Sequence, residues 1–414
     1  MNNAFVASTM TACPENLIDS ARVQVYLGKN GWRIVKDPAV ADLIILNTCG
    51  LVNYSVNCSV DAVERLQRVS KKGAKFIAWG CLAKIDPEVL KQVYDGPIFG
   101  EDEIFKLDEI IKATTPINDV VANELGSRYQ NQIKKNGTRK DAYGIGVSLI
   151  KWYYSYFERK LNLCRPSASS IFYIKTSTGC LNNCAYCVVR NSSGRIRSKS
   201  VDEIMVEFKN GLDKGYKEFS LLATDLGPHG RDLNYTLADL LREMVKVEGE
   251  YRIGLRNVNP HYLERMLNDM EPVLSSGKVW FIGIPLESGS NRILKSMRRN
   301  HTAEGFRKSL AFIKRTNPDI TIRTQLMVGF PTETEGDFSE TMQLFDEADL
   351  DFAEVYRFSS RPGTTAYEMD EQVPESVARR RLEKLVVKVL VSTTRRELGR
   401  RFSLSVPRRQ TKQN

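Results

Sequence analysis

Thr178-Gly-Cys180-Leu-Asn-Asn-Cys184-Ala-Tyr-Cys187 places three cysteines at CxxxCxxC spacing, directly after the strand-like run Ile171–Lys175. A loop of this length can wrap three thiolates around one corner of a cubane iron–sulfur cluster, which leaves the fourth iron open to a small molecule. Zinc is the alternative, but a structural zinc ion usually takes four protein ligands. The loop offers no fourth ligand and the chain has only three histidines, so the spacing favours the cluster.

Three further cysteines follow the strands that we predict in residues 1–112. The expected strands cover 4–7, 41–46 and 75–79, with helices at 15–30 and 56–70 between them, and this alternation predicts a parallel sheet. Cys13, Cys49 and Cys81 each follow a strand end within a few residues, and those ends share one edge of an open parallel sheet. We therefore expect these thiols to converge, either on a second cluster or as buried free cysteines.

From residue 169 onward the pattern predicts six strand–helix units. The expected strands are Ile171–Lys175, Glu218–Ala223, Tyr251–Leu255, Val279–Ile284, Thr321–Val328 and Phe352–Phe358. Repeated units of this kind favour a parallel barrel with its function at the carboxyl ends of the strands, and six units predict a partial (β/α)6 TIM-type barrel. The chain is thus of the α/β class, with an open parallel-sheet domain ahead of the barrel.

The cysteine loop resembles that of the radical S-adenosylmethionine (SAM) superfamily, in which the open iron binds the amino and carboxylate groups of SAM. Three stretches of the first domain resemble the radical-SAM methylthiotransferases, nearer the RimO-like branch than the MiaB-like branch: Ala12-Cys13-Pro-Glu-Asn-Leu-Ile-Asp-Ser20, Asn47-Thr-Cys49-Gly50 and Trp79-Gly-Cys81-Leu82. The resemblance implies a flavodoxin-like first domain and two [4Fe–4S] clusters, one held by Cys180, Cys184 and Cys187 and one by Cys13, Cys49 and Cys81. It also implies SAM as cofactor, an electron donor of the flavodoxin or ferredoxin type, and insertion of a methylthio group at a C–H carbon.

Polar and glycine-rich loops follow the barrel strands and suit SAM. Glycine allows close backbone approach, a carboxylate can accept from a ribose hydroxyl or an ammonium group, and an arginine can pair with a carboxylate. The candidate SAM-binding residues are Asp225, Glu287, Gly329 and Arg361. The chain departs from the family pattern with Arg190, Thr224, His229 and Glu287, and we expect His229, in a loop, to be exposed to solvent.

Composition favours a cytoplasmic protein with no membrane partner, since 42% of residues are hydrophobic, 27% are charged and no apolar run approaches the ~20 residues of a membrane span. The expected division is 1–112 for the first domain, 113–168 for a linker with an amphipathic helix at 147–157, 169–375 for the radical-SAM core and 376–414 for a basic helix and tail. Cys58 and Cys164 match no motif and are interpreted as structural.

The sequence is compatible with several classes of substrate. Residues 375–414 carry twelve Lys and Arg against three Glu, which suits either an RNA partner or a solvated helix face. The RimO-like motifs favour a peptide or protein side chain. The stretch after residue 400 is too short for the β-barrel TRAM domain typical of the family, which favours a specialised target such as a natural-product peptide or small molecule. The alternatives are tRNA, a radical-SAM enzyme that transfers no sulfur, and a non-catalytic module with structural zinc.

Overall fold

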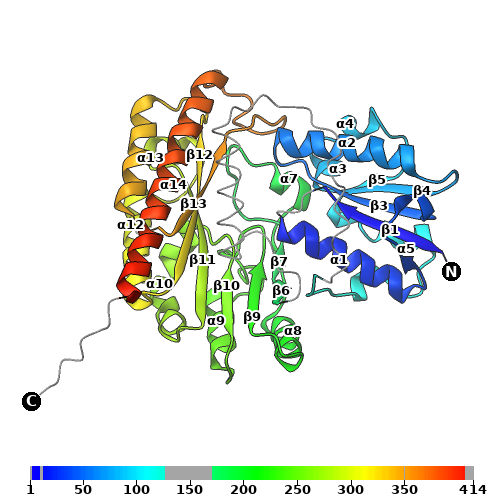
Figure 1. The fold of residues 1–414 in the computed structure, drawn as a ribbon, viewed down its shortest axis with the longest axis horizontal. Helices are drawn as coiled ribbons and strands as arrows, with labels where there is room; N and C mark the ends of the chain where they lie inside the picture. Colours follow the sequence, from blue (N-terminus) through cyan, green and yellow to red (C-terminus); the bar gives the residue numbers. More distant parts are fainter. Residues whose placement is uncertain (1, 10–12, 126–169, 349, 406–414) are drawn as a thin grey trace, which may run out of the picture.

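The computed structural model describes residues 2–9, 13–125, 170–348 and 350–405. The predicted helix at 147–157 and Cys164 lie outside these ranges. Two parallel sheets dominate the described chain, one in its first quarter and one after residue 170, and they lie on opposite sides of the molecule in Figure 1. The predicted α/β class, with an open parallel sheet followed by a partial barrel, is confirmed. The domain limits within 1–414 stay a prediction.

The N-terminal sheet has the strand order β2-β1-β3-β4-β5, and every pairing in it is parallel. Its central strand β3 is buried at all six positions, which is why its sequence reads as a continuous apolar run rather than an alternating one. The elements are β1 (Asn3–Ser8), α1 (Pro14–Lys29), β2 (Arg33–Ile34), β3 (Leu43–Thr48), α2 (Asn53–Val69), β4 (Lys75–Gly80), α3 (Cys81–Ile85), α4 (Pro87–Lys91), β5 (Ile98–Phe99) and α5 (Lys106–Ile111).

The second sheet has the order β13-β12-β11-β10-β9-β6, so all six predicted barrel strands pair in parallel with their neighbours in the chain. They are β6 (Ile171–Lys175), β9 (Glu218–Leu222), β10 (Arg252–Leu255), β11 (Val279–Glu287), β12 (Thr321–Val328) and β13 (Phe352–Arg357). The helices between them are α8 (Val201–Asp213), α9 (Leu237–Lys246), α10 (Pro260–Ser275), α11 (Asn291–Ser296), α12 (Ala303–Thr316) and α13 (Glu335–Glu347).

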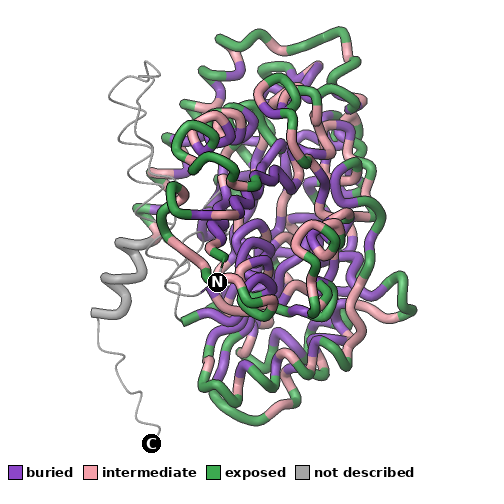
Figure 2. Tube along the Cα trace, turned by 90° about the vertical axis from the view of Figure 1, so that its right-hand side faces the viewer, coloured by how far each residue is buried: buried purple, intermediate pink, exposed green. Residues whose placement is uncertain are grey.

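Capping boxes start three of these helices at the positions that their sequences indicate. Ser200, Thr236 and Thr334 each accept a hydrogen bond from the backbone three residues on, where an acidic side chain bonds back. Apolar faces of the helices pack on the sheet around Phe219 and Leu326, and buried residues fill the interior in Figure 2. No described helix is long and apolar enough to cross a membrane.

The last helix, α14 (Glu375–Ser405), lies along the barrel beside α13 and β13, coloured red in Figure 1. Arg381 enters the protein and donates to the Glu333 carboxylate at 2.8 Å, with both side chains almost fully buried. Lys388 pairs with Asp346 of α13. Part of the positive charge of this helix is therefore used within the fold.

Candidate active site

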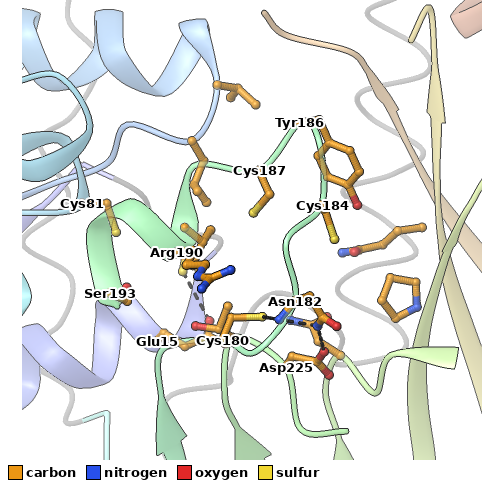
Figure 3. Close-up of a pocket in the computed structure, with 18 of the residues that line it drawn as sticks. Glu15, Cys81, Cys180, Asn182, Cys184, Tyr186, Cys187, Arg190, Ser193 and Asp225 are labelled. Carbon is orange, nitrogen blue, oxygen red and sulfur yellow. Dashed lines mark hydrogen bonds between the residues drawn. The ribbon is translucent and has the colours of Figure 1, made fainter. Parts of the chain in front are cut away.

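A cavity of about 760 Å³ lies between the two sheets, at the carboxyl ends of their strands. All six cysteines of the two predicted triads line it: Cys13, Cys49, Cys81, Cys180, Cys184 and Cys187. Figure 3 shows Cys180, Cys184 and Cys187 along the cluster loop, with Cys81 across from them on the side of the N-terminal sheet. The expected convergence of the three distant cysteines is therefore found in the structure.

The loop of Cys180, Cys184 and Cys187 is held at its base by a short antiparallel ladder between β7 (Ser177–Thr178) and β8 (Arg197–Ser198). Gly179 has φ +76°, and a Cβ there would lie 2.2 Å from the carbonyl oxygen of Arg195, so only glycine fits. At the next position, the Cys180 sulfur accepts from Asn182 Nδ2 at 3.3 Å, and that amide also donates to Asp225 at 2.6 Å. Asp225 thereby ties the cysteine loop to the loop after β9.

Each N-terminal cysteine sits where a strand gives way to a helix. Cys13 precedes α1, Cys49 follows β3 and Cys81 opens α3. The Cys49 amide donates to Ser59 Oγ of α2 at 3.0 Å, which fixes the turn after β3. Gly80 has φ +106°, and a Cβ there would lie 2.4 Å from the Asn47 side chain, so this position also requires glycine.

Burial keeps five of the six triad thiols protonated. Burial is the main cause that raises the pKa of Cys13, Cys49, Cys81 and Cys180, and it raises the pKa of Cys187 to about 12. These groups are thus neutral thiols without a metal, and binding must displace their protons.

The arrangement of the thiols also bears on the kind of metal centre. No three His, Cys, Asp or Glu side chains in the described ranges are close enough around one point to bind a single metal ion. Each triad supplies three cysteines, which is the number of protein ligands that a cubane cluster with one open iron requires.

Two of the four predicted SAM-binding residues line the cavity. Asp225 accepts hydrogen bonds from the backbone of Gly227 at 2.9 Å and of Asn259 at 3.1 Å, and burial raises its pKa. Glu287 ends β11 with φ +76°, and burial raises its pKa as well. Both carboxylates face the cavity on the barrel side.

Gly329 and Arg361 lie outside the lining of the cavity. A Cβ at Gly329 would lie 2.5 Å from the Ala378 side chain, so its close approach is to α14. Arg361 is buried between the domains and donates to Asn53 Oδ1 at 2.9 Å. A contact of either residue with SAM stays a prediction.

His229 is fully buried, so the expectation of an exposed loop histidine is wrong. Its Nε2 lies 3.0 Å from the hydroxyl of Tyr235, and burial lowers the pKa of the imidazole to about 4. The loop after β9 folds back over the barrel instead of extending into solvent, which the local sequence did not indicate. Cys58 is half-buried in α2 and does not line the cavity.

Two charged groups at the cavity were missed by the sequence prediction. Lys175 at the end of β6 donates to both oxygens of Asp19 at 2.9 Å and to Glu101, joining the barrel to the N-terminal sheet. On the opposite wall, Glu354 of β13 accepts from Arg323 at 2.9 Å and from Tyr356 at 2.6 Å. Both residues could have been recognised in the sequence as charged residues in otherwise apolar strands, Lys175 in β6 and Glu354 in β13.

The fold and the two cysteine triads define a radical-SAM enzyme with an additional N-terminal domain. The sequence matches the Radical SAM superfamily over residues 174–345 and Uncharacterized protein family UPF0004 over residues 6–99. Similar chains include the ribosomal protein uS12 methylthiotransferase RimO of Thermodesulfovibrio yellowstonii, at 30% identity over 92% of this chain and 81% of that protein. The threonylcarbamoyladenosine tRNA methylthiotransferase MtaB of Thermotoga maritima is also 30% identical, over 90% of this chain and 79% of that protein.

This chain therefore belongs to the radical-SAM methylthiotransferase family, and the predicted family and enzyme class are confirmed. Membership implies SAM and a [4Fe–4S] cluster. Among solved structures, the radical SAM methyltransferase TsrM of Kitasatospora setae is similar with a TM-score of 0.57 at 13% identity, over 88% of this chain and 75% of that one. At this identity the likeness concerns the fold alone.

Proposed function

We propose that this chain inserts a methylthio group at a C–H carbon with two [4Fe–4S] clusters and SAM. Cys180, Cys184 and Cys187 would hold the SAM-binding cluster, and Cys13, Cys49 and Cys81 would hold the auxiliary one. When bound, these groups supply SAM cleavage, hydrogen abstraction and sulfur donation. The observation that carries the proposal is that both triads, from separate sheets, line one cavity.

The residues of the chain position these groups and shield them from water. Asn182 and Asp225 hold the Cys180 turn through two short hydrogen bonds. Asp225 and Glu287 are the carboxylates available to an ammonium group or ribose of SAM on the barrel side. Lys175, with Asp19 and Glu101, sets how far the triads lie apart because it joins the elements that carry them.

Iron content tests the proposal. Anaerobic reconstitution with iron and sulfide is expected to give about eight irons per chain, falling to about four when Cys13, Cys49 and Cys81 become Ala. SAM cleavage should survive in that variant, whereas methylthio product, detected by mass spectrometry, should vanish. Cys58→Ala is the matched control, since this cysteine lies outside the cavity, and should keep all the iron. One tightly bound zinc and no SAM cleavage would falsify the proposal.

For the substrate we propose a peptide or protein side chain, or a specialised small molecule, presented in a cytoplasmic setting with a flavodoxin- or ferredoxin-type reductant. The second candidate is tRNA, favoured by relatives of equal identity that are named as tRNA enzymes. Two cations of α14 are paired within the protein, Arg381 with Glu333 and Lys388 with Asp346. Because these cations are not free to bind phosphates, the pairs support the first candidate. Binding that weakens steeply between 50 and 200 mM salt would support tRNA.

A further inference from the structure

A buried arginine contacts one cysteine of the predicted SAM-binding triad. On the barrel side, Arg299 follows α11 and is 9% exposed. Its Nη2 donates to the Pro285 carbonyl at 2.5 Å, and its Nη1 lies 3.7 Å from the Cys184 sulfur, within hydrogen-bonding range of a thiolate. A buried guanidinium therefore lies directly against one ligand of the predicted SAM-binding cluster.

The other described neighbours of Arg299 hold its guanidinium beside Cys184. Its Nε has no hydrogen-bond partner among the described residues, so the side chain is oriented by Pro285 and Cys184. Glu287 and Tyr186 contribute further electrostatic interactions with the guanidinium. Because the group is buried, its effect on the sulfur is screened less than that of a surface arginine.

Carboxylates lie near the cysteines of both triads. The Cys13 thiol donates to Glu15 at 3.4 Å. Asp19 and Glu101 lie close enough to Cys81 to raise the pKa of its thiol, after burial, and Lys175 opposes them. On the barrel side, Asp225 and Glu287 act in the same direction on Cys180 and Cys187. What distinguishes the barrel side is therefore the direct contact of a buried guanidinium with a ligand sulfur.

We propose that Arg299 is a positioning residue that makes the cluster of Cys180, Cys184 and Cys187 easier to reduce than it would be without this guanidinium. Cluster potentials rise with positive charge and with hydrogen bonds to the sulfurs. This would favour delivery of one electron from the external flavodoxin- or ferredoxin-type donor to the cluster that would bind SAM. The inference rests on the proposed two-cluster function.

An EPR-monitored redox titration of the reconstituted full chain tests this. The SAM-binding cluster is identified as the signal that changes when SAM is added. In Arg299→Gln, the ratio of reduced to oxidised cluster at a fixed potential should fall about tenfold, equivalent to a shift of about 59 mV to more negative potential. The other signal should not move. Arg298→Gln is the matched control, because Arg298 is adjacent but exposed and should leave both potentials unchanged.

Arg299→Lys separates charge from loop geometry, since it keeps the cation with a different shape. Its potential should lie nearer the wild type than that of Arg299→Gln. An unchanged potential in Arg299→Gln, or an equal shift in Arg298→Gln, overturns the proposal. So does a lysine variant that binds no iron, because the residue would then hold the loop instead. Iron content of only four per chain would contradict two clusters, yet the remaining signal would still test Arg299.

Discussion

Cys180, Cys184 and Cys187 come from one short loop, whereas Cys13, Cys49 and Cys81 come from three strand ends far apart in the chain. The first set is brought together by local backbone geometry around Gly179 and Asn182. The second exists only when the parallel sheet is formed in register. A local triad should therefore tolerate damage to the other domain, while the distributed triad should depend on the stability of its whole sheet.

The largest effects are expected at the two glycines that precede a cysteine. Gly80→Ala would place a Cβ against Asn47, and Gly179→Ala would place one against Arg195. These clashes add to the backbone strain of about 1–3 kcal/mol that a residue other than glycine has in such a conformation. Gly80→Ala should lose about four irons and keep SAM cleavage. Gly179→Ala should abolish SAM cleavage.

Gly31→Ala serves as the control for strain without a clash. Gly31 also has positive φ, but no atom lies within 4 Å of a Cβ built there. This variant should keep all its iron. If Gly80→Ala and Gly179→Ala reduced SAM cleavage equally, the two triads would not be independent.

The next largest effect concerns the ion pairs that join the triads. Lys175→Met would leave the buried Asp19 and the half-buried Glu101 without their cation, which costs up to about 3–5 kcal/mol in unfolding free energy. Urea denaturation followed by circular dichroism measures it. Lys217→Met, which breaks an exposed pair with Glu250, should leave the unfolding free energy nearly unchanged. Equal stability of the two variants would show that apolar packing alone sets the distance between the triads.

Acid should separate the two regions because all three histidines lie in the barrel. The pKa of His229 is about 4 in the folded protein, below its ordinary 6.5, so the unfolded chain binds the extra proton. Stability is then full above pH 6.5 and falls by about 3 kcal/mol as pH decreases to 4. His229→Gln should reduce this loss of stability in urea titrations, and His301→Gln should reduce a further loss at lower pH, because burial lowers the pKa of His301 to about 3. If the N-terminal sheet unfolded before the barrel as the pH is lowered, the expectation would be wrong.

The smallest effect is expected at Ser59, which supports the distributed triad. Ser59→Ala would leave the buried Cys49 amide without its acceptor, at a cost of about 1–2 kcal/mol. Ser339→Ala removes a hydroxyl with a similar bond to the preceding turn, but on an exposed helix face, and should change stability by less than about 0.5 kcal/mol. Iron content of the Ser59 variant after mild heating reports whether the Cys49 turn limits auxiliary cluster retention.

Sequence periodicity predicted the long elements well and the short ones poorly. The barrel strands at 171–175 and 321–328 were predicted to the residue, because buried parallel strands read as apolar runs bounded by turn residues. The edge strands β2 and β5 have two residues each and were not predicted. A two-residue strand has no periodicity of its own and forms only because a neighbouring strand is already in place.

The sequence alone determined which cysteines form the triads, since CxxxCxxC spacing and strand-end positions are properties of the chain. It also determined the α/β class, through the alternation of apolar runs with amphipathic helices. Only the tertiary structure decided that both triads line one cavity, that Lys175 pairs with Asp19 and Glu101 across the domains, and that Arg299 lies against Cys184. These contacts join residues far apart in the chain, and pairings of that kind depend on how sheets and loops pack, which no local pattern encodes.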